Sequence, residues 1–167
     1  MKKILKISLI VLGSAAVIFA GVMLTYRYVK SMDVIESEEV NKSATGGHVL
    51  LATQGSDFKN SVMDQVKQDM KDKNVHISVV DTTKLDKVNA GAYDKIVLFT
   101  TVQSDDIPKN VTEFMNDNKD KSMHIAVTAD SNRWDDKPKD VDAISEASKN
   151  ENKQTFVDNL TEAITSP

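Results

Sequence analysis

The sequence predicts an α/β fold, a doubly wound parallel sheet of four to five strands preceded by a single transmembrane helix. Three observations support this prediction. Residues 7–26 contain no charged side chain and are almost wholly apolar. From residue 48 onward, short apolar runs alternate with amphipathic helical patterns. The chain of 167 residues is long enough for one hydrophobic core beside the apolar segment, but not for two.

The apolar segment predicts a retained membrane anchor over residues 7–29. Twenty uncharged residues at ~1.5 Å per residue span ~30 Å, the thickness of the hydrocarbon layer. The alternative is a cleaved signal peptide, whose apolar core has roughly 7–15 residues and ends at a small-x-small site. Here the apolar run continues beyond Ala20-Gly21 to Leu24, which favours the anchor.

Charges on the two sides of the anchor predict its orientation. Three lysines and the free amino group precede it, whereas only Arg27 and Lys30 follow it closely. By the positive-inside rule, residues 1–6 are cytoplasmic and the single-pass chain carries its soluble domain outside the cell membrane. Residues 30–47 are polar and lack periodicity, so we expect a flexible stalk.

Composition excludes several classes of function. The part from Arg27 onward carries 18 basic and 25 acidic residues, a net charge of −7. An acidic domain without a basic run argues against nucleic-acid binding. The absence of cysteine excludes disulfides, thiolate zinc sites and iron–sulfur clusters. The Lys-, Asn- and Asp-rich composition is typical of a bacterial chain.

The soluble domain is expected over residues 48–165. Apolar runs predict strands at residues 48–53, 75–80, 95–101 and 123–128, with a stub of a fifth at 141–144. Ser56 is a suitable cap for a helix in which Phe58, Val62, Val66 and Met70 recur every four residues. Further helices are expected from Pro108 and around residues 156–164, and a weak helical or irregular crossover over residues 81–93.

Ligands of doubly wound sheets bind at the carboxyl ends of the strands, where the strand order reverses. The loops that meet this condition are residues 53–57, 101–108 and 128–136. The paired carboxylates Asp105-Asp106 and Asp135-Asp136 lie on two of them and are expected to be solvated turn residues.

The stretch from His48 to Ile164 resembles the flavodoxin-like family. The resemblance rests on Leu51-Ala-Thr-Gln-Gly-Ser-Asp-Phe-Lys59, on Tyr93-Asp-Lys-Ile-Val-Leu-Phe-Thr100 with Ile107-Pro-Lys-Asn-Val-Thr-Glu-Phe114 behind it, and on Met123-His-Ile-Ala-Val-Thr128. It implies an FMN site in which Thr53, Gly55 and Ser56 hold the phosphate and Trp134 packs against the flavin. The loop departs from the family pattern, because it is one residue short and carries Asp57 where a hydroxyl would serve.

A second, shorter resemblance concerns Asp142-Ala-Ile-Ser-Glu-Ala-Ser148. It is similar to the attachment signature of extracytoplasmic flavin carriers, which implies FMN linked through a phosphodiester to Ser148. Glu146 replaces the small residue of that signature. The alternative interpretation is the fifth-strand stub, followed by Ser145 as the cap of the last helix.

Three histidines each begin a predicted strand: His48, His76 and His124. This places them at the edge opposite the expected ligand site, with His48 and His76 on neighbouring strands ~4.8 Å apart. Such a set is more typical of strand-end polar residues than of a metal site, so we expect no metal. No nucleophilic triad can be assembled at the functional edge, so no catalytic residue is assigned.

These observations lead to one function and one alternative. The leading prediction is a membrane-anchored, extracytoplasmic flavodoxin-like domain that acts as a binding or accessory module for an unknown membrane or envelope protein, without a tight FMN site and without enzymatic activity of its own. The alternative is an FMN-dependent electron carrier, with the flavin bound noncovalently or attached to Ser148.

Overall fold

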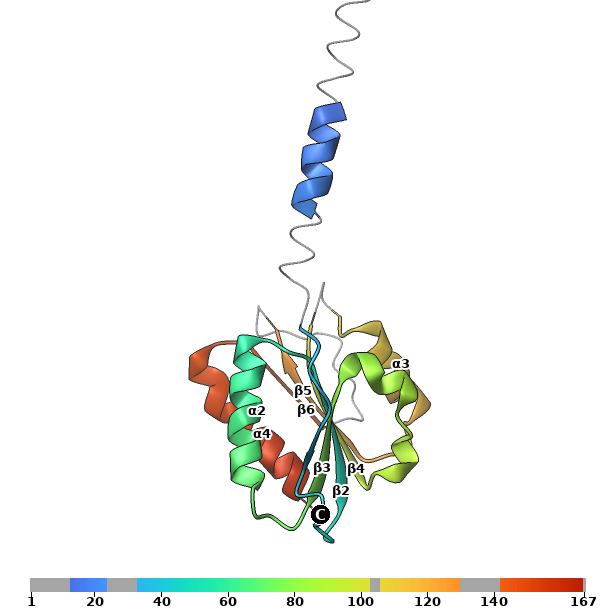
Figure 1. Ribbon diagram of the computed structural model, residues 1–167, viewed down its shortest axis with the longest axis vertical. Coiled ribbons are helices and arrows are strands. Elements are labelled where there is room, and N and C mark those ends of the chain that lie inside the picture. Colours follow the sequence, from blue (N-terminus) through green and yellow to red (C-terminus); the bar gives the residue numbers. More distant parts are fainter. Residues whose placement is uncertain (1–12, 24–32, 103–105, 130–141, 167) are drawn as a thin grey trace, which may run out of the picture. The chain divides into compact units, whose positions relative to one another are not determined.

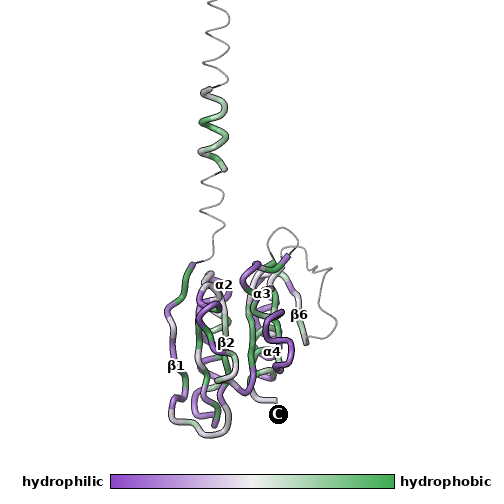
Figure 2. Tube along the Cα trace, turned by 90° about the vertical axis from the view of Figure 1, so that its right-hand side faces the viewer, coloured by the Kyte–Doolittle hydropathy of each residue, from purple (hydrophilic) through white to green (hydrophobic). Residues whose placement is uncertain are grey.

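The computed structural model describes residues 13–23, 33–102, 106–129 and 142–166, in two units, Met1–Met32 and Asp33–Pro167. In the first unit, residues 13–23 form a helix that is largely hydrophobic (Figure 2). Its apolar side chains, such as Val17 and Phe19, are exposed. Among the described residues, no helix is long and apolar enough to cross a membrane. Most of the anchor predicted over residues 7–29 lies outside the described part of the chain, so the anchor stays a prediction.

The second unit contains a mixed sheet of six strands in the order β1-β3-β2-β4-β5-β6 (Figure 1). The strands are β1 (Glu38–Val40), β2 (His48–Thr53), β3 (His76–Asp81), β4 (Lys95–Thr101), β5 (Met123–Thr128) and β6 (Asp142–Glu146). Strands β2 to β6 are parallel, and β1 runs antiparallel to β3. The five parallel strands follow the doubly wound order of flavodoxins, 2-1-3-4-5, which confirms the expected topology.

Helices cover both faces of this sheet, which is why its central strands are apolar throughout. On one face lie α2 (Asp57–Met70) and α4 (Lys153–Thr165); on the other lie α3 (Lys109–Asp117) and the 3-10 helices η1 (Thr82–Lys87) and η2 (Ala90–Ala92) (Figure 1). Ser56 caps α2 as predicted, since its Oγ accepts a hydrogen bond from the Lys59 N–H. A third 3-10 helix, η3 (Asn150–Asn152), precedes α4, whose cap position is Asn152 and not Ser145.

The expectation of four to five strands was wrong by one, because β1 lies in the segment predicted to be a stalk. Its sequence, Glu-Glu-Val, carries no apolar run that would reveal a strand. It forms by pairing antiparallel with the edge of β3 and is itself the outermost strand of the sheet. Asn41, at φ 52°, then turns the chain and donates from Nδ2 to the carbonyls of Met70, Lys73 and Val75. Residues 33–47 therefore belong to the domain.

Candidate functional site

The carboxyl ends of β2, β4 and β5 meet at one edge of the sheet, and each of these strands ends on a threonine. The three residues are Thr53, Thr101 and Thr128. The chain leaves β2 for β3 on one side, while β4 lies on the other side, so this edge contains the point where the strand order reverses. In doubly wound sheets a ligand binds at this place.

The loop after β2 contains the three residues predicted to hold a phosphate, and at least one polar group of each is bonded within the protein. Thr53 is buried and its Oγ1 donates to the Gln54 carbonyl at 3.3 Å. The Gly55 N–H donates to the Asp33 carbonyl at 2.7 Å, and the Asp33 N–H donates back to Gly55 at 3.1 Å. The Ser56 hydroxyl accepts a hydrogen bond from the backbone N–H of Lys59 in α2. All three residues are therefore engaged in contacts within the protein.

Gly55 is required for this closure. A Cβ at position 55 would lie 2.7 Å from the carbonyl oxygen of Asp33, closer than real Cβ contacts allow. Two residues after Asp33, the N–H of Ile35 donates a hydrogen bond to Asp81 Oδ2 at 2.9 Å. We call residues 33–37 the covering segment, because it bonds to the residues that follow β2 and to the end of β3.

Lys59 is buried directly behind this loop, with 1% of its surface exposed. Its Nζ hydrogen-bonds to Thr101 Oγ1 and, at 3.2 Å, to Thr128 Oγ1, and it lies 5.5 Å from the centroid of the Phe99 ring. In the described part of the chain no carboxylate pairs with this amine. Burial lowers the pKa of Lys59 from 10.5 to about 8, because water can no longer solvate the charged form.

Two threonine hydroxyls contact the Lys59 amine, and a third threonine, Thr100, joins them through its backbone carbonyl. Thr101 Oγ1 and Thr128 Oγ1 are 2.8 Å apart, and Thr128 Oγ1 also lies 3.3 Å from the Thr100 carbonyl. Thr100 Oγ1 donates to Gln54 Oε1 at 3.3 Å. We call Lys59, Thr100, Thr101 and Thr128 the lysine–threonine cluster. An ammonium among hydroxyls, with no acidic side chain bonded to it in the described part of the chain, favours an anion as its partner.

The two other predicted site residues are not brought to this cluster. Ser148 is exposed in a bend after β6, the strand that the alternative interpretation of residues 142–148 predicted. Since β6 is three strands from β2, Ser148 lies on the order of 14 Å along the sheet from the loop at Gly55. Trp134 lies outside the described residues, as do Asp105, Asp135 and Asp136.

Sequence reasoning missed Lys59, although the sequence contains a signal for it. We predicted the apolar stripe of α2 from Phe58, Val62, Val66 and Met70, but Phe58 is only half-buried. The buried stripe begins at Lys59 and continues through Val62, Met63, Val66 and Met70. A lysine at the first position of a buried stripe is the pattern that identifies a buried cation.

No protein-family model matches the chain, and no curated protein matches it. Similar solved structures include a short-chain flavodoxin associated with a non-canonical PDU bacterial microcompartment, at 14% identity over 71% of this chain and 95% of that one, with a TM-score of 0.47. A mutant flavodoxin from Pseudomonas aeruginosa is 12% identical over 71% of this chain and 99% of that one, with a TM-score of 0.47. A flavodoxin from Streptococcus pneumoniae is 13% identical over 68% and 96%, with a TM-score of 0.43.

Proposed function

We propose that this chain is a binding module without a tight flavin site, and that its carboxyl edge binds a small anionic group through Lys59. One observation carries the proposal. The Gly55 N–H in the loop after β2 is bonded to Asp33, while the buried Lys59 ammonium beside that loop has, among the described residues, threonine hydroxyls as its hydrogen-bond partners. The edge therefore retains affinity for negative charge but lacks the loop that a flavin phosphate needs.

The closed loop argues against tight FMN binding. A phosphate dianion is held by free backbone N–H groups at a helix N-terminus. Here the Gly55 N–H is bonded to Asp33, and Asp57 places a carboxylate in the first turn of α2. Opening the loop requires removal of the covering segment and breakage of its bond to Asp81.

A small anion at the lysine–threonine cluster has a clear energetic basis. With a pKa of about 8, Lys59 is mostly protonated at pH 7 and bears the cost of desolvation, with no carboxylate bonded to it among the residues that the structure describes. An anion would offset that cost, since a charge-assisted hydrogen bond is stronger than a bond to a neutral hydroxyl. Binding would also raise the pKa of Lys59 toward its ordinary value.

We further propose that the N-terminal segment holds this module at the outer face of the cell membrane. The uncharged stretch, the lysines before it and the exposed apolar side chains of residues 13–23 support a membrane anchor. Its protein partner would be a membrane or envelope protein. Fractionation of cells that express the full chain tests this part: recovery in the soluble fraction would contradict it.

The anion proposal is tested with the full-length chain in mild detergent. Inorganic phosphate and sulfate are titrated while the melting temperature and the binding heat are recorded. We expect the wild type to be stabilised and Lys59→Met to show no response, because the cation is gone. Lys109→Met is the matched control, since Lys109 is exposed on α3 and should leave the response unchanged. Equal responses of wild type and Lys59→Met would contradict the proposal.

The second candidate is an FMN-dependent electron carrier, which the flavodoxin strand order and the position of the hydroxyls at the reversal point favour. FMN is added to the same protein, and a sample is coexpressed with a flavin transferase. A retained yellow colour supports noncovalent binding, whereas a mass increase that Ser148→Ala removes supports covalent attachment. Colourless protein with an unchanged melting temperature contradicts both forms of the carrier.

A further inference from the structure

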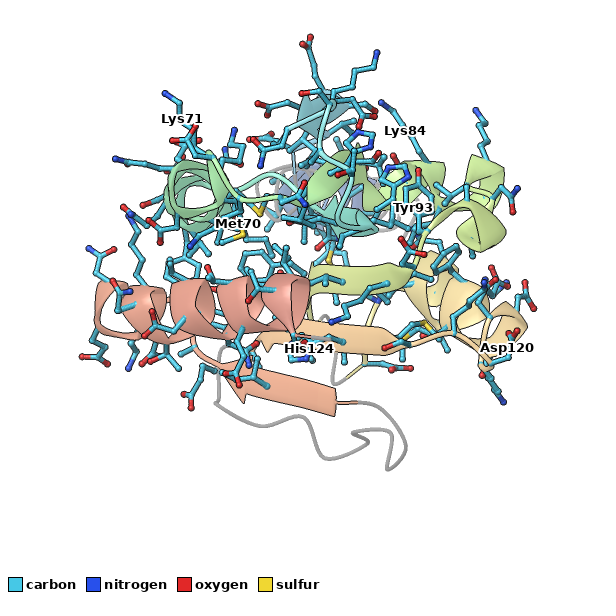
Figure 3. The ribbon with its side chains drawn as sticks, turned by 90° about the horizontal axis from the view of Figure 1, so that it is seen from below. Met70, Lys71, Lys84, Tyr93, Asp120 and His124 are labelled. Atoms are coloured by element: carbon cyan, nitrogen blue, oxygen red, sulfur yellow. The ribbon has the colours of Figure 1, made fainter. Side chains whose placement is uncertain are left out.

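A second polar cluster lies at the opposite, amino edge of the sheet, where three neighbouring strands contribute side chains. His48 of β2 is paired in register with His76 of β3. Glu39 of β1 is paired with Ser78 of β3, two residues after His76 and thus on the same face of the strand. Figure 3 views this edge; Tyr93, labelled there, packs its ring against His48 with the centroids 4.5 Å apart.

The side chains of this cluster converge. The imidazole rings of His48 and His76 are stacked, with centroids 4.1 Å apart and planes only 1° from parallel. His76 Nε2 lies 2.6 Å from Glu39 Oε2. One nitrogen of each histidine and one oxygen of Glu39 all lie within 4.8 Å of one another.

We propose that Glu39, His48 and His76 form a binding site for a divalent transition-metal ion such as Zn²⁺. Two imidazoles and a carboxylate are ligands that Zn²⁺ accepts with one position left for water or another ligand. Ligand atoms of a tetrahedral site with ~2.0 Å bonds are ~3.3 Å apart, so the donors, which lie within 4.8 Å of one another, would move closer. One of the two stacked imidazole rings would also turn, so that its in-plane lone pair points at the ion. On binding, the metal would take the place of the hydrogen bond between His76 Nε2 and Glu39 Oε2, and the single proton of the neutral imidazole would then be on Nδ1.

Ser78 supports these ligands from behind. It is buried, and its hydroxyl donates to Glu39 Oε2 at 2.8 Å while it lies 2.8 Å from His48 Nε2. A hydroxyl that orients two ligands is a typical second layer of a metal site. The ligands remain accessible, since 19% of the His76 side chain and 44% of the Glu39 side chain are exposed. A metal ion can therefore enter without unfolding the sheet.

Metal binding is measured by isothermal titration of the tag-free full-length chain with ZnCl₂, and by the visible absorption of Co²⁺ in its place. We expect one ion per chain, with a tetrahedral Co²⁺ spectrum, and no competition from Mg²⁺. His48→Gln and His76→Gln should abolish binding, and Glu39→Gln should weaken it at least ~10-fold. Ser78→Ala should weaken it about 10-fold through loss of orientation.

Glu38→Gln is the matched control, because Glu38 is the neighbour of Glu39 on β1 and pairs instead with Lys67 of α2. It should bind Zn²⁺ as the wild type does. Unchanged affinity in both His76→Gln and Glu39→Gln, or the absence of any binding heat in the wild type, would overturn the proposal. If a histidine variant loses its circular-dichroism spectrum, Glu39→Gln against Glu38→Gln decides the question, since neither changes the size of the side chain.

Discussion

The polar groups at the carboxyl edge of the sheet are bonded or buried, whereas those at the amino edge are partly exposed. At the carboxyl edge, Gly55 is bonded to Asp33 and Lys59 is buried among threonines. At the amino edge, His76 and Glu39 are partly exposed and their donor atoms converge. The first edge is closed over a buried charge, whereas the second gathers accessible ligands.

One short stretch of chain accounts for much of this difference. The covering segment closes the loop after β2, and β1, which follows it directly, carries Glu39 to the histidines. Residues 33–40 therefore contact both edges of the sheet, the carboxyl edge through Asp33 and Ile35 and the amino edge through Glu39.

The largest effect is expected at the carboxyl edge from Asp81→Ala. This buried carboxylate accepts hydrogen bonds from the N–H of Ile35, at 2.9 Å, and from the N–H and hydroxyl of Thr83, at 2.8 and 2.6 Å. Their loss should lower the free energy of unfolding by about 3 kcal/mol, because the backbone donors lose their partner. Urea denaturation measures it. Asp86→Ala, an exposed change in η1, should cost little, and equal losses in the two variants would show that Asp81 does not hold the covering segment.

Lys59→Met is expected to stabilise the same edge. At pH 7 it should raise the free energy of unfolding by roughly 1–3 kcal/mol, because a desolvated charge is replaced by an apolar side chain of similar size. The wild type should gain stability as the pH rises from about 8 to 10.5, since over this range the folded state has released the Lys59 proton and the unfolded state still binds it. Below pH 8 both states are protonated and the gain is absent.

Urea denaturation at pH 7 and pH 10 separates these two effects of Lys59→Met. The variant should lack the rise seen in the wild type over this interval, while Lys109→Met should keep it. A loss of stability of Lys59→Met at pH 7 would mean that the ammonium already has a strong partner.

A smaller effect is expected where β1 joins the amino edge. Asn41→Ala removes the three hydrogen bonds from Nδ2 to the carbonyl of Met70, the last residue of α2, and to those of Lys73 and Val75 between α2 and β3. It also places alanine at φ 52°. We expect a loss of about 1–2 kcal/mol. Hydrogen exchange should show β1 opening before the rest of the sheet. Glycine adopts the backbone angle at position 41 without strain, so the difference in unfolding free energy between Asn41→Ala and Asn41→Gly measures that strain. Identical hydrogen-exchange protection of β1 in the wild type and in Asn41→Ala would contradict the role of this turn.

The smallest effect is expected from Glu38→Gln. The ion pair with Lys67 is 3.0 Å long, and both side chains are substantially exposed to solvent. Its loss should change the free energy of unfolding by less than about 1 kcal/mol, and salt should reduce the difference further. Thermal melting at low and high ionic strength measures it. A loss comparable to that of Asp81→Ala would show that β1 is held mainly by this charge pair.

Local features were predicted correctly because they depend on neighbours in the chain. The apolar runs of β2 and β4 and the helix cap at Ser56 follow from short stretches of sequence. The strand β1 was missed because Glu38-Glu39-Val40 contains no periodic signal, and it forms only when the edge of β3 is available. Glu39 was therefore absent from the predicted set, although His48 and His76 were expected to approach each other.

The sequence by itself determined the class of fold, the order of its main elements and the acidity that argues against nucleic acid. Only the tertiary structure decided which polar groups meet: Asp33 with Gly55, Glu39 with His76, and Lys59 with Thr128. The physical reason is that these partners are separated by 22, 37 and 69 positions in the sequence. Local propensity does not act over such separations, and the packed sheet alone brings these residues together.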